Sequence, residues 1–428
     1  MREQATILLA RRAPTIKQWS FDARSEGQFA YSLYRLGHPE KVECPIHHSA
    51  KFSPYRMQRI IATKENTLPQ SGLPDHTLMR GLNSKPSPLP HARVIDLCCG
   101  LGGLSLAATE LGMHVVGGVD HDSNALKTFM RNFPQTEVIA GSVRSSKVMN
   151  RCKELFRKAT HPHSPRIVIS GPPCQGFSAA GSRDPKDLRN KVLIAVARAI
   201  TALKPDCALI ENVSTVLSEK YDTRMKKFEE VLAGSKYHVL RLVLDASEFG
   251  VPQKRKRAFL LVTRKRLNES DVTARLRDYN LPAAKVEDVL SGLPTPAIRP
   301  DDYRDEIDYG CKPNHLAMQH SRRVIAKIAN IEPGKGPMSY RKLHPTRLSN
   351  TLFSGHRAPP AHFREPRSIT VREAARLQGF PDSFRIYGSF SNQMMQVTNA
   401  VPPPLARAVL RVLLEVTSLG TPQNAEPR

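Results

Sequence analysis

The feature that most constrains the fold is a series of short apolar stretches separated by helical patterns, between residues 93 and 263. Strands are predicted at residues 93–97, 115–120, 137–140, 166–170, 207–210, 238–244 and 258–263. Helices are predicted between several of them, at residues 104–111, 123–133 and 190–203. Strands that alternate with helices form a mostly parallel sheet with helices on both faces. The sequence therefore predicts an α/β fold.

The sequence outside residues 91–264 predicts an N-terminal extension, an inserted domain and a C-terminal segment. Residues 1–90 form a basic, partly flexible extension that ends in a linker rich in proline and glycine, and residues 19–34 indicate a small helical element within it. Regular patterning fades between residues 265 and 366, which indicates a smaller inserted domain. Helical periodicity returns at residues 371–378 and 403–414. Residues 367–418 are therefore expected to rejoin the domain of residues 91–264, before a short tail at 419–428.

Charge is the second constraint, because the formal net charge is +25 and the isoelectric point is near 10.0. Such an excess of positive charge usually accompanies a polyanionic partner, and nucleic acid is the commonest one. No apolar run reaches the roughly 18 residues that span a bilayer. We also find no secretory signal, so a cytoplasmic protein without a membrane partner is expected.

The seven cysteines form no recognisable disulfide or metal framework. Their odd number, their scatter and the adjacent pair Cys98-Cys99 argue against disulfides. Cys44, His47 and His48 are candidate zinc ligands, but no second ligand pair lies nearby, and structural zinc sites need four ligands. No metal site is therefore expected.

A glycine-rich turn separates the first predicted strand from the first predicted helix and has the sequence Asp96-Leu97-Cys98-Cys99-Gly100-Leu101-Gly102-Gly103. Glycine permits positive φ and lets a ligand approach the backbone closely. Ligands of such sheets bind beyond the carboxyl ends of the strands, and Asp120 ends the second strand. An ordinary tight turn and a dinucleotide site stay open, since the spacing is not GxGxxG. The carboxylate of Asp120 favours a nucleoside cofactor, whose ribose hydroxyls it can bind.

A cysteine directly follows the fourth predicted strand, in the sequence Gly171-Pro172-Pro173-Cys174-Gln175. Proline fixes its own φ and restricts the residue before it, so Cys174 is expected to be held rigidly. Rigid placement suits a nucleophile that must approach one carbon atom at a defined angle. A buried, inert thiol is the commoner fate of cysteine, and this fragment alone leaves the two alternatives equally open.

Two charged motifs follow. Glu211 comes directly after an apolar strand, where a carboxylate is costly unless it is hydrogen-bonded or functional, although it could also cap a helix. Gln253, Arg255 and Arg257 alternate along an extended segment and are expected to point to the same side. A solvated charge run is the alternative, but the apolar run at 258–262 favours a set that points into a site.

In this order, the motifs resemble those of the cytosine-5 DNA methyltransferase family. The resemblance extends to residues 370–381 (TVREAARLQGFP) and to Asn399-Ala400-Val401-Pro402-Pro403, and it covers residues 93–263 and 367–415. It implies a Rossmann-like fold that uses S-adenosylmethionine, with residues 91–264 as the catalytic and cofactor-binding domain and residues 265–366 as the target-recognition region. The short variable region and single catalytic block resemble the bacterial enzymes of restriction-modification systems.

The resemblance also assigns roles to single residues. Cys174 matches the catalytic nucleophile, Glu211 the acid, and Arg255 and Arg257 the arginine pair. The cofactor site that it implies comprises Asp96, Cys98, Gly100, Gly102, Gly103, Asp120, His121, Ser142, Pro173, Val192, Asn399 and Ala400.

Three positions near the cofactor depart from the family pattern. The family usually has phenylalanine at the position of Cys98, so the adenine would lose an aromatic neighbour. Ser142 stands where the family often has aspartate, and a serine accepts a bond from the adenine amine more weakly. Thr398 stands where a glycine usually precedes Asn399. We expect weaker cofactor binding but no loss of a catalytic group.

The implied reaction is covalent catalysis on a cytosine that is flipped out of duplex DNA. The thiolate of Cys174 would attack carbon 6 and so make carbon 5 nucleophilic, while Glu211 would donate a proton to ring nitrogen 3. Basic residues of the variable region are expected mostly to contact phosphate, which positions DNA without specifying its sequence. These residues are Arg275, Arg277, Arg322, Arg323, Lys327, Arg341, Lys342 and Arg347.

Other functions explain the sequence less well. Methyltransferases of transfer RNA that share this chemistry usually carry Cys-Phe-Thr in the variable region, and that tripeptide is absent. Non-catalytic members typically lose the cysteine or the acid, and a nicotinamide oxidoreductase leaves the Pro-Cys-Gln and Glu-Asn-Val motifs unexplained. We therefore expect a monomeric bacterial enzyme in the cytoplasm, associated with the nucleoid and functionally linked to a cognate restriction endonuclease.

Overall fold

The computed structural model describes residues 92–158, 164–173, 191–301, 303, 312–337, 340–353 and 359–419, together with the backbone of three N-terminal strands. The chain divides into two compact units, Met1–Thr77 and Leu78–Arg428, and each is described by itself. Cys174 and the possible zinc ligands at residues 44–48 lie outside the described residues.

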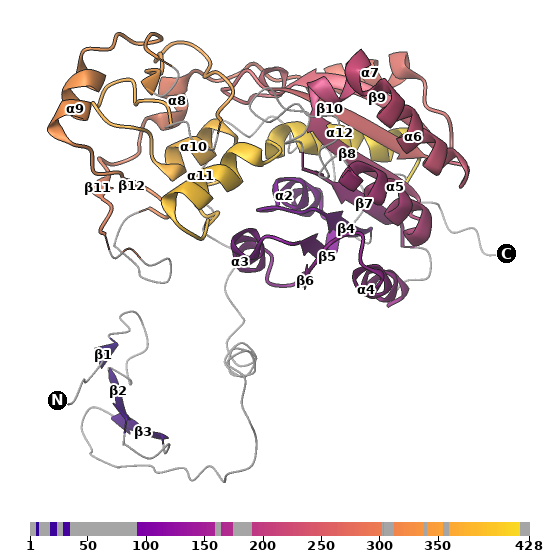
Figure 1. Cartoon of the computed structure of the whole chain (residues 1–428), viewed down its shortest axis with the longest axis horizontal. Helices are drawn as coiled ribbons and strands as arrows, with labels where there is room; N and C mark the ends of the chain where they lie inside the picture. The colour runs from indigo at the N-terminus through magenta and orange to yellow at the C-terminus, as the bar shows by residue number, and fades with distance from the viewer. Residues whose placement is uncertain are drawn as a thin grey trace. The chain divides into compact units, whose positions relative to one another are not determined.

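The second unit is built on a seven-stranded sheet with the strand order β6-β5-β4-β7-β8-β10-β9 (Figure 1). Its strands are β4 (Arg93–Leu97), β5 (His114–Asp120), β6 (Glu137–Ala140), β7 (Arg166–Ser170), β8 (Cys207–Val213), β9 (His238–Asp245) and β10 (Lys256–Thr263). The five strands from β6 to β8 pair in parallel, whereas β10 inserts antiparallel between β8 and β9. All seven predicted strands and the mostly parallel α/β fold are confirmed.

Helices cover both faces of this sheet. On one face lie α2 (Gly103–Glu110), α3 (Ser123–Asn132), α7 (Glu269–Arg277) and α12 (Pro403–Val416), which share one apolar core. On the other face lie α4 (Ser146–Arg157), α5 (Lys191–Leu203) and α6 (Asp222–Ala233), which share a second core. Neighbouring strand residues alternate between the two cores, as Val94 and Ile95 do, because side chains of a strand point to opposite faces.

Between α7 and α10 the chain forms α8 (Val286–Leu290), the two short parallel strands β11 (Ala297–Ile298) and β12 (Leu316–Ala317), and α9 (Arg322–Ala329). The chain then returns through α10 (Val371–Leu377) and α11 (Phe390–Asn399) to α12, which packs on α2 and α7. A capping box fixes the start of α10, since Thr370 Oγ1 accepts from Glu373 N and a carboxylate oxygen of Glu373 accepts from Thr370 N. The predicted helices at 371–378 and 403–414 are therefore confirmed.

One prediction about the N-terminal region is wrong. The stretch 19–34, predicted to contain a small helix, contributes the strands β2 (Gln18–Ala23) and β3 (Phe29–Tyr34), which pair antiparallel. Trp19 and Phe21 alternate with polar residues, as do Phe29, Tyr31 and Leu33 with small or polar ones. Apolar residues at every second position are the pattern of a strand. This spacing, and not the number of aromatic and apolar residues, indicates the structure of this stretch.

Candidate active site

The carboxyl ends of β4, β5, β7 and β8 bring most of the predicted site residues together. The chain order reverses between β4 and its neighbours β5 and β7, and ligands of open α/β sheets bind outside the strand ends at such a switch point. Asp96, Asp120 and Glu211 lie on β4, β5 and β8, and residues 171–173 follow β7 directly.

The turn after β4 is held open by its own backbone. Cys98 and Gly100 adopt positive φ values of 62° and 53°. Gly100 N donates to Asp120 Oδ2 at 2.9 Å, and a Cβ added to Gly100 would meet no atom within 4 Å. Asp120 Oδ1 also accepts from the backbone N–H groups of His121 and Asp122, at 2.7 and 3.0 Å. Asp120 therefore ties the turn to the end of β5 and leaves open space above Gly100.

The other two glycines of the turn are required by packing. A Cβ on Gly102 would lie 2.3 Å from the ring of Phe133, and Gly102 itself has a φ of 102°. A Cβ on Gly103 would lie 2.3 Å from the carbonyl oxygen of Val401. These contacts explain both glycines through α3 and the C-terminal return. Direct contact of Gly102 and Gly103 with a cofactor therefore stays a prediction.

Asp96 is a buried carboxyl at the base of this turn. Ser105 Oγ donates to Asp96 Oδ2 at 2.7 Å, while Asp96 Oδ1 has no hydrogen-bond partner among the described residues. Burial raises the pKa of Asp96 to about 8; the charge of Asp120 adds to this, and the bond from Ser105 opposes it. A buried oxygen without a partner favours a ligand that carries a donor or a positive charge.

The remaining predicted cofactor residues surround the same edge of the sheet with different exposure. His121 is 81% exposed, with Nδ1 3.3 Å from Asp120 Oδ1. Ser142 is exposed and its hydroxyl accepts from Arg144 N at 3.2 Å, just after Gly141, whose N–H donates to the carbonyl of Asp120 at 2.8 Å. Val192 and Ala400 are half-buried, and Asn399 is the exposed last residue of α11.

The loop that carries Cys174 leaves the sheet between the cofactor turn and Glu211. Ser170 Oγ donates to the carbonyl of Leu97 at 2.5 Å, and Asn212 Nδ2 donates to the carbonyl of Pro172 at 3.2 Å. A Cβ on Gly171 would lie 3.9 Å from both Cys98 O and Glu211 Oε2. The loop therefore begins close to both the cofactor turn and Glu211. Pro173, its last described residue, is half-buried.

Glu211 and Arg257 form the charged pair of the site. Arg257 Nε lies 2.9 Å from Glu211 Oε1, and the side chains are only 12% and 8% exposed. Burial raises the pKa of Glu211, although the positive charges of Arg257 and Arg255 act against it. Glu211 therefore holds a proton more readily than an exposed glutamate does, as a proton donor requires.

The Gln253, Arg255 and Arg257 side chains bind different parts of the molecule. Gln253 is buried and contacts the carbonyl of Leu377 and the N–H of Leu352, both at 3.4 Å. Arg255 Nη2 donates to the carbonyls of Thr398 and Ala400, at 2.7 and 2.8 Å. The expectation that all three point to one site stays a prediction: the charges of Arg257 and Arg255 both act on Glu211, and Arg257 forms an ion pair with it. Gln253 and Arg255 brace the end of α10 and the residues beside Asn399.

One departure from the family pattern, Thr398, lies at this contact with Arg255. Thr398 is buried, its hydroxyl donates to Met395 O at 3.2 Å within α11, and its carbonyl accepts from Arg255. Its side chain is thus satisfied within the helix.

Sequence reasoning missed Asn212 and Ser170, which hold the start of the loop, although Asn212 lies inside the Glu-Asn-Val motif.

The comparisons with known proteins identify the family of this chain. The sequence model of the family described as C-5 cytosine-specific DNA methylase matches residues 92–415, so the chain belongs to that family. It is a DNA methyltransferase that acts on carbon 5 of cytosine.

Its relatives include bacterial enzymes of similar length. The Type II methyltransferase M.XorII of Xanthomonas oryzae is 32% identical over 361 residues, which cover 74% of this chain and 82% of the relative. M.DdeI of Desulfomicrobium norvegicum is 28% identical over 374 residues, covering 74% of this chain and 87% of the relative.

Solved structures show the same fold. A chain described as a DNA modification methyltransferase of an E. coli prophage superposes with a TM-score of 0.62 at 28% identity, covering 76% of this chain and 99% of that one. The Dnmt2 methyltransferase of S. pombe has a TM-score of 0.54 at 17% identity, covering 76% and 98%, and shows the fold alone.

Proposed function

We propose that this enzyme transfers the methyl group of S-adenosylmethionine to carbon 5 of a cytosine within a specific duplex sequence, through a covalent bond to Cys174. The observation that carries the proposal is the buried pair of Glu211 and Arg257, set beside the first residues of the Cys174 loop. A protonated carboxyl beside a nucleophile loop is the arrangement that attack on a pyrimidine ring needs.

The residues at the strand ends fit this cofactor. Asp96 Oδ1 is a buried acceptor without a partner among the described residues, and it suits the positive charge of the methionine part. Asp120 keeps its carboxylate beside the open space over Gly100, where ribose hydroxyls can donate to it. When bound, the cofactor supplies an electrophilic methyl group. Cys98 and Ser142 offer its adenine weaker contacts than phenylalanine and aspartate would.

The chain's own residues then divide the chemistry. The Cys174 thiolate forms a bond to carbon 6 of the ring, and Glu211 gives its proton to ring nitrogen 3, so that carbon 5 becomes nucleophilic. Arg257 holds Glu211 in place and would face the carbonyl oxygen of the base. After transfer, a base removes the proton on carbon 5 and the cysteine leaves. Arg255 acts as a positioning residue, because its Nη2 donates to the backbone on both sides of Asn399.

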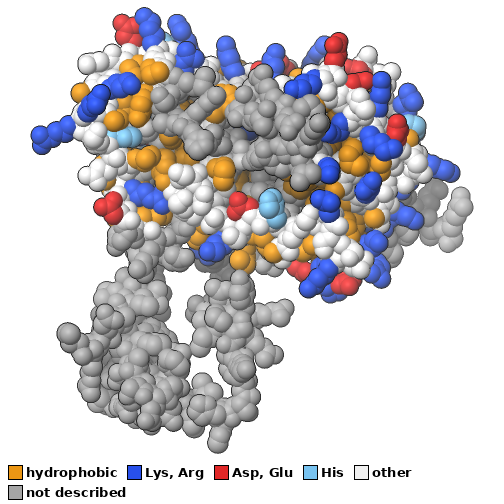
Figure 2. Space-filling model, in the orientation of Figure 1, with side chains coloured by type: hydrophobic (Ala, Val, Ile, Leu, Met, Phe, Trp, Pro, Cys, Tyr) orange, Lys and Arg blue, Asp and Glu red, His pale blue; other side chains and the backbone are white. Residues whose placement is uncertain are grey.

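We infer that residues 265–366 hold the target DNA. Arg322, Arg323 and Lys327 are exposed on α9, and Figure 2 shows lysine and arginine side chains spread over the visible face. The net charge of +25 suits contacts with phosphate, and these contacts help to offset the few kcal/mol that flipping a base costs.

We also infer that the enzyme is a monomer of the bacterial cytoplasm that works beside a restriction endonuclease. Relatives that are named Type II methyltransferases support this inference. No helix among the described residues is long and apolar enough to cross a membrane.

Bisulfite sequencing of DNA from a bacterial host that expresses the gene tests the function directly. We expect cytosine to resist bisulfite conversion in one short sequence context and nowhere else. DNA from a host that expresses Cys174→Ser gives the background level. In a separate assay, the purified protein is offered transfer RNA as the alternative substrate. Absence of any protected context, or methylation of transfer RNA alone, would contradict the proposal.

Asp96 predicts a pH dependence of cofactor binding. The free protein holds a proton on Asp96 below about pH 8, and only the ionised carboxylate attracts a cation. Affinity attributable to Asp96 should therefore rise with pH, by up to about tenfold per unit, and level off above pH 8. The amino group of the cofactor also titrates near pH 8. Calorimetry should therefore compare wild type with Asp96→Asn, whose ratio of affinities isolates Asp96. An equal ratio at pH 6 and pH 8 would show that Asp96 does not meet the cation.

A further inference from the structure

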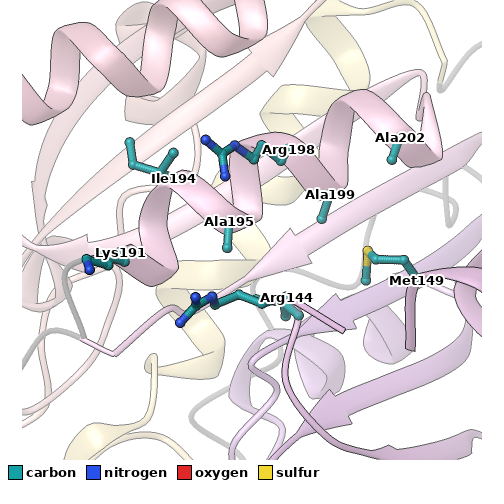
Figure 3. A pocket seen from close by; sticks show the side chains of 9 residues that line it. Arg144, Met149, Lys191, Ile194, Ala195, Arg198, Ala199 and Ala202 are labelled. Carbon is teal, nitrogen blue, oxygen red and sulfur yellow. The ribbon is translucent and has the colours of Figure 1, made fainter. Parts of the chain in front are cut away.

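A hollow of about 570 Å³ lies between α5 and the segment that leads into α4 (Figure 3), and neither Glu211 nor Arg257 is among its described lining residues. Its described lining residues come from residues 143–149 and from α5. They are Val143, Arg144, Met149, Lys191, Ile194, Ala195, Arg198, Ala199 and Ala202. The volume lies within the range of about 300–1,000 Å³ that small-molecule sites occupy.

The floor of the hollow is apolar and has little relief. Ala195, Ala199 and Ala202 follow one another at helical spacing along α5 and point into the hollow, with Met149 opposite them (Figure 3). Ala195 and Ala199 are buried, whereas Ala202 is the exposed end of this floor. A row of methyl groups forms a surface on which a planar ring can lie, and a thioether packs well against an aromatic ring.

The rim carries three cations and, among the described lining residues, no carboxylate. Arg144, Lys191 and Arg198 are exposed, and within the described part of the chain none of their side chains has a hydrogen bond or an ion pair. By contrast, the guanidinium of Arg151 on α4 binds Glu137 and Glu154 at 2.5 to 2.6 Å. The three cations of the rim therefore have positive charge to offer an anion.

We propose that this hollow is a second ligand site, which binds a nucleoside phosphate with its base on the alanine floor and its phosphate between Arg144, Lys191 and Arg198. Guanidinium and ammonium groups are the usual partners of phosphate, and an apolar floor favours a nucleotide over phosphate alone. The site is separate from the cofactor site, but it adjoins it. Arg144 lies two residues after Ser142, and Lys191 directly precedes Val192.

Calorimetric titration of the full-length protein with ADP tests the proposal, with S-adenosylhomocysteine present at saturation to fill the cofactor site. We expect ADP to bind under these conditions and to bind less tightly as salt is raised. The double variant Arg144→Gln/Arg198→Gln should weaken ADP by about tenfold or more, since each lost contact is a charged hydrogen bond. Arg157→Gln is the matched control, because Arg157 ends α4 outside the hollow and should leave ADP affinity unchanged.

A second variant separates the floor from the rim. Ala202→Trp adds bulk at an exposed position of the hollow, so it should abolish ADP binding while inorganic phosphate still binds. Loss of ADP binding on addition of S-adenosylhomocysteine would place the nucleotide in the cofactor site and overturn the proposal. So would undetectable ADP binding at millimolar concentration. A rim variant that weakens duplex DNA but not ADP would assign the cations to DNA instead.

Discussion

Cys174→Ser is expected to abolish methyl transfer to DNA, with a loss on the order of 10⁴-fold or more. The thiolate is the nucleophile, and a serine hydroxyl ionises too weakly to replace it at neutral pH. The loop that carries Cys174 starts from residues anchored by Ser170 and Asn212, and the substitution replaces only the sulfur atom of Cys174 by oxygen. Incorporation of labelled methyl groups into a duplex substrate measures the loss.

A covalent trap separates this mechanism from a merely structural role of the thiol. Duplex DNA that carries 5-fluorocytosine at the target should form a stable adduct with the wild-type enzyme, because fluorine cannot leave as the proton does. Cys174→Ser should form none. Cys152→Ala is a suitable control, since it removes a buried thiol in α4 and leaves the loop intact. Full activity of Cys174→Ser, or an adduct that survives the substitution, would overturn the mechanism.

The sheet could be predicted from the sequence because each of its strands is a short apolar run with few competing patterns. Several helices could not. Few residues of α4 and α6 are buried, and many of the others are charged. The buried residues are Val148, Cys152, Leu155 and Phe156 in α4, and Met225, Phe228 and Leu232 in α6. Such helices gain their stability from packing on a sheet, and their isolated sequences carry little apolar signal.

The candidate site was predictable in its order but not in its connections. The family resemblance assigned Glu211 and Arg257 to one catalytic site, and they meet at 2.9 Å. It could not indicate that Arg255 reaches the carbonyls of Thr398 and Ala400, more than a hundred residues away along the chain. Bonds from side chains to distant backbone depend on how the C-terminal return packs, and no local pattern encodes that packing. The glycine turn shows the same limit, because Gly102 and Gly103 are explained by contacts with Phe133 and Val401.

Glu211→Gln is expected to lower the rate of methyl transfer by about 10²- to 10⁴-fold, which is the usual contribution of a positioned proton donor. The amide keeps the size of the side chain and an oxygen that can accept from Arg257, but it has no proton to give. Because burial raises the pKa of Glu211, the protonated form of the wild type persists to higher pH than in an exposed glutamate. The wild-type rate should therefore fall as pH rises through that pKa, and the variant should lack this fall.

The pH profile is the measurement that distinguishes acid catalysis from a structural role of Glu211. Single-turnover rates across the pH range should be compared for wild type, Glu211→Gln and Glu230→Gln. The last variant removes an exposed carboxylate of α6 that pairs with Lys227, so it controls for the loss of one negative charge. A thermal midpoint for each variant separates slow chemistry from unfolding. If Glu211→Gln were folded and as active as Glu230→Gln, the proton on ring nitrogen 3 would have to come from another group. The pair of Glu211 and Arg257 would then serve only to hold the loop.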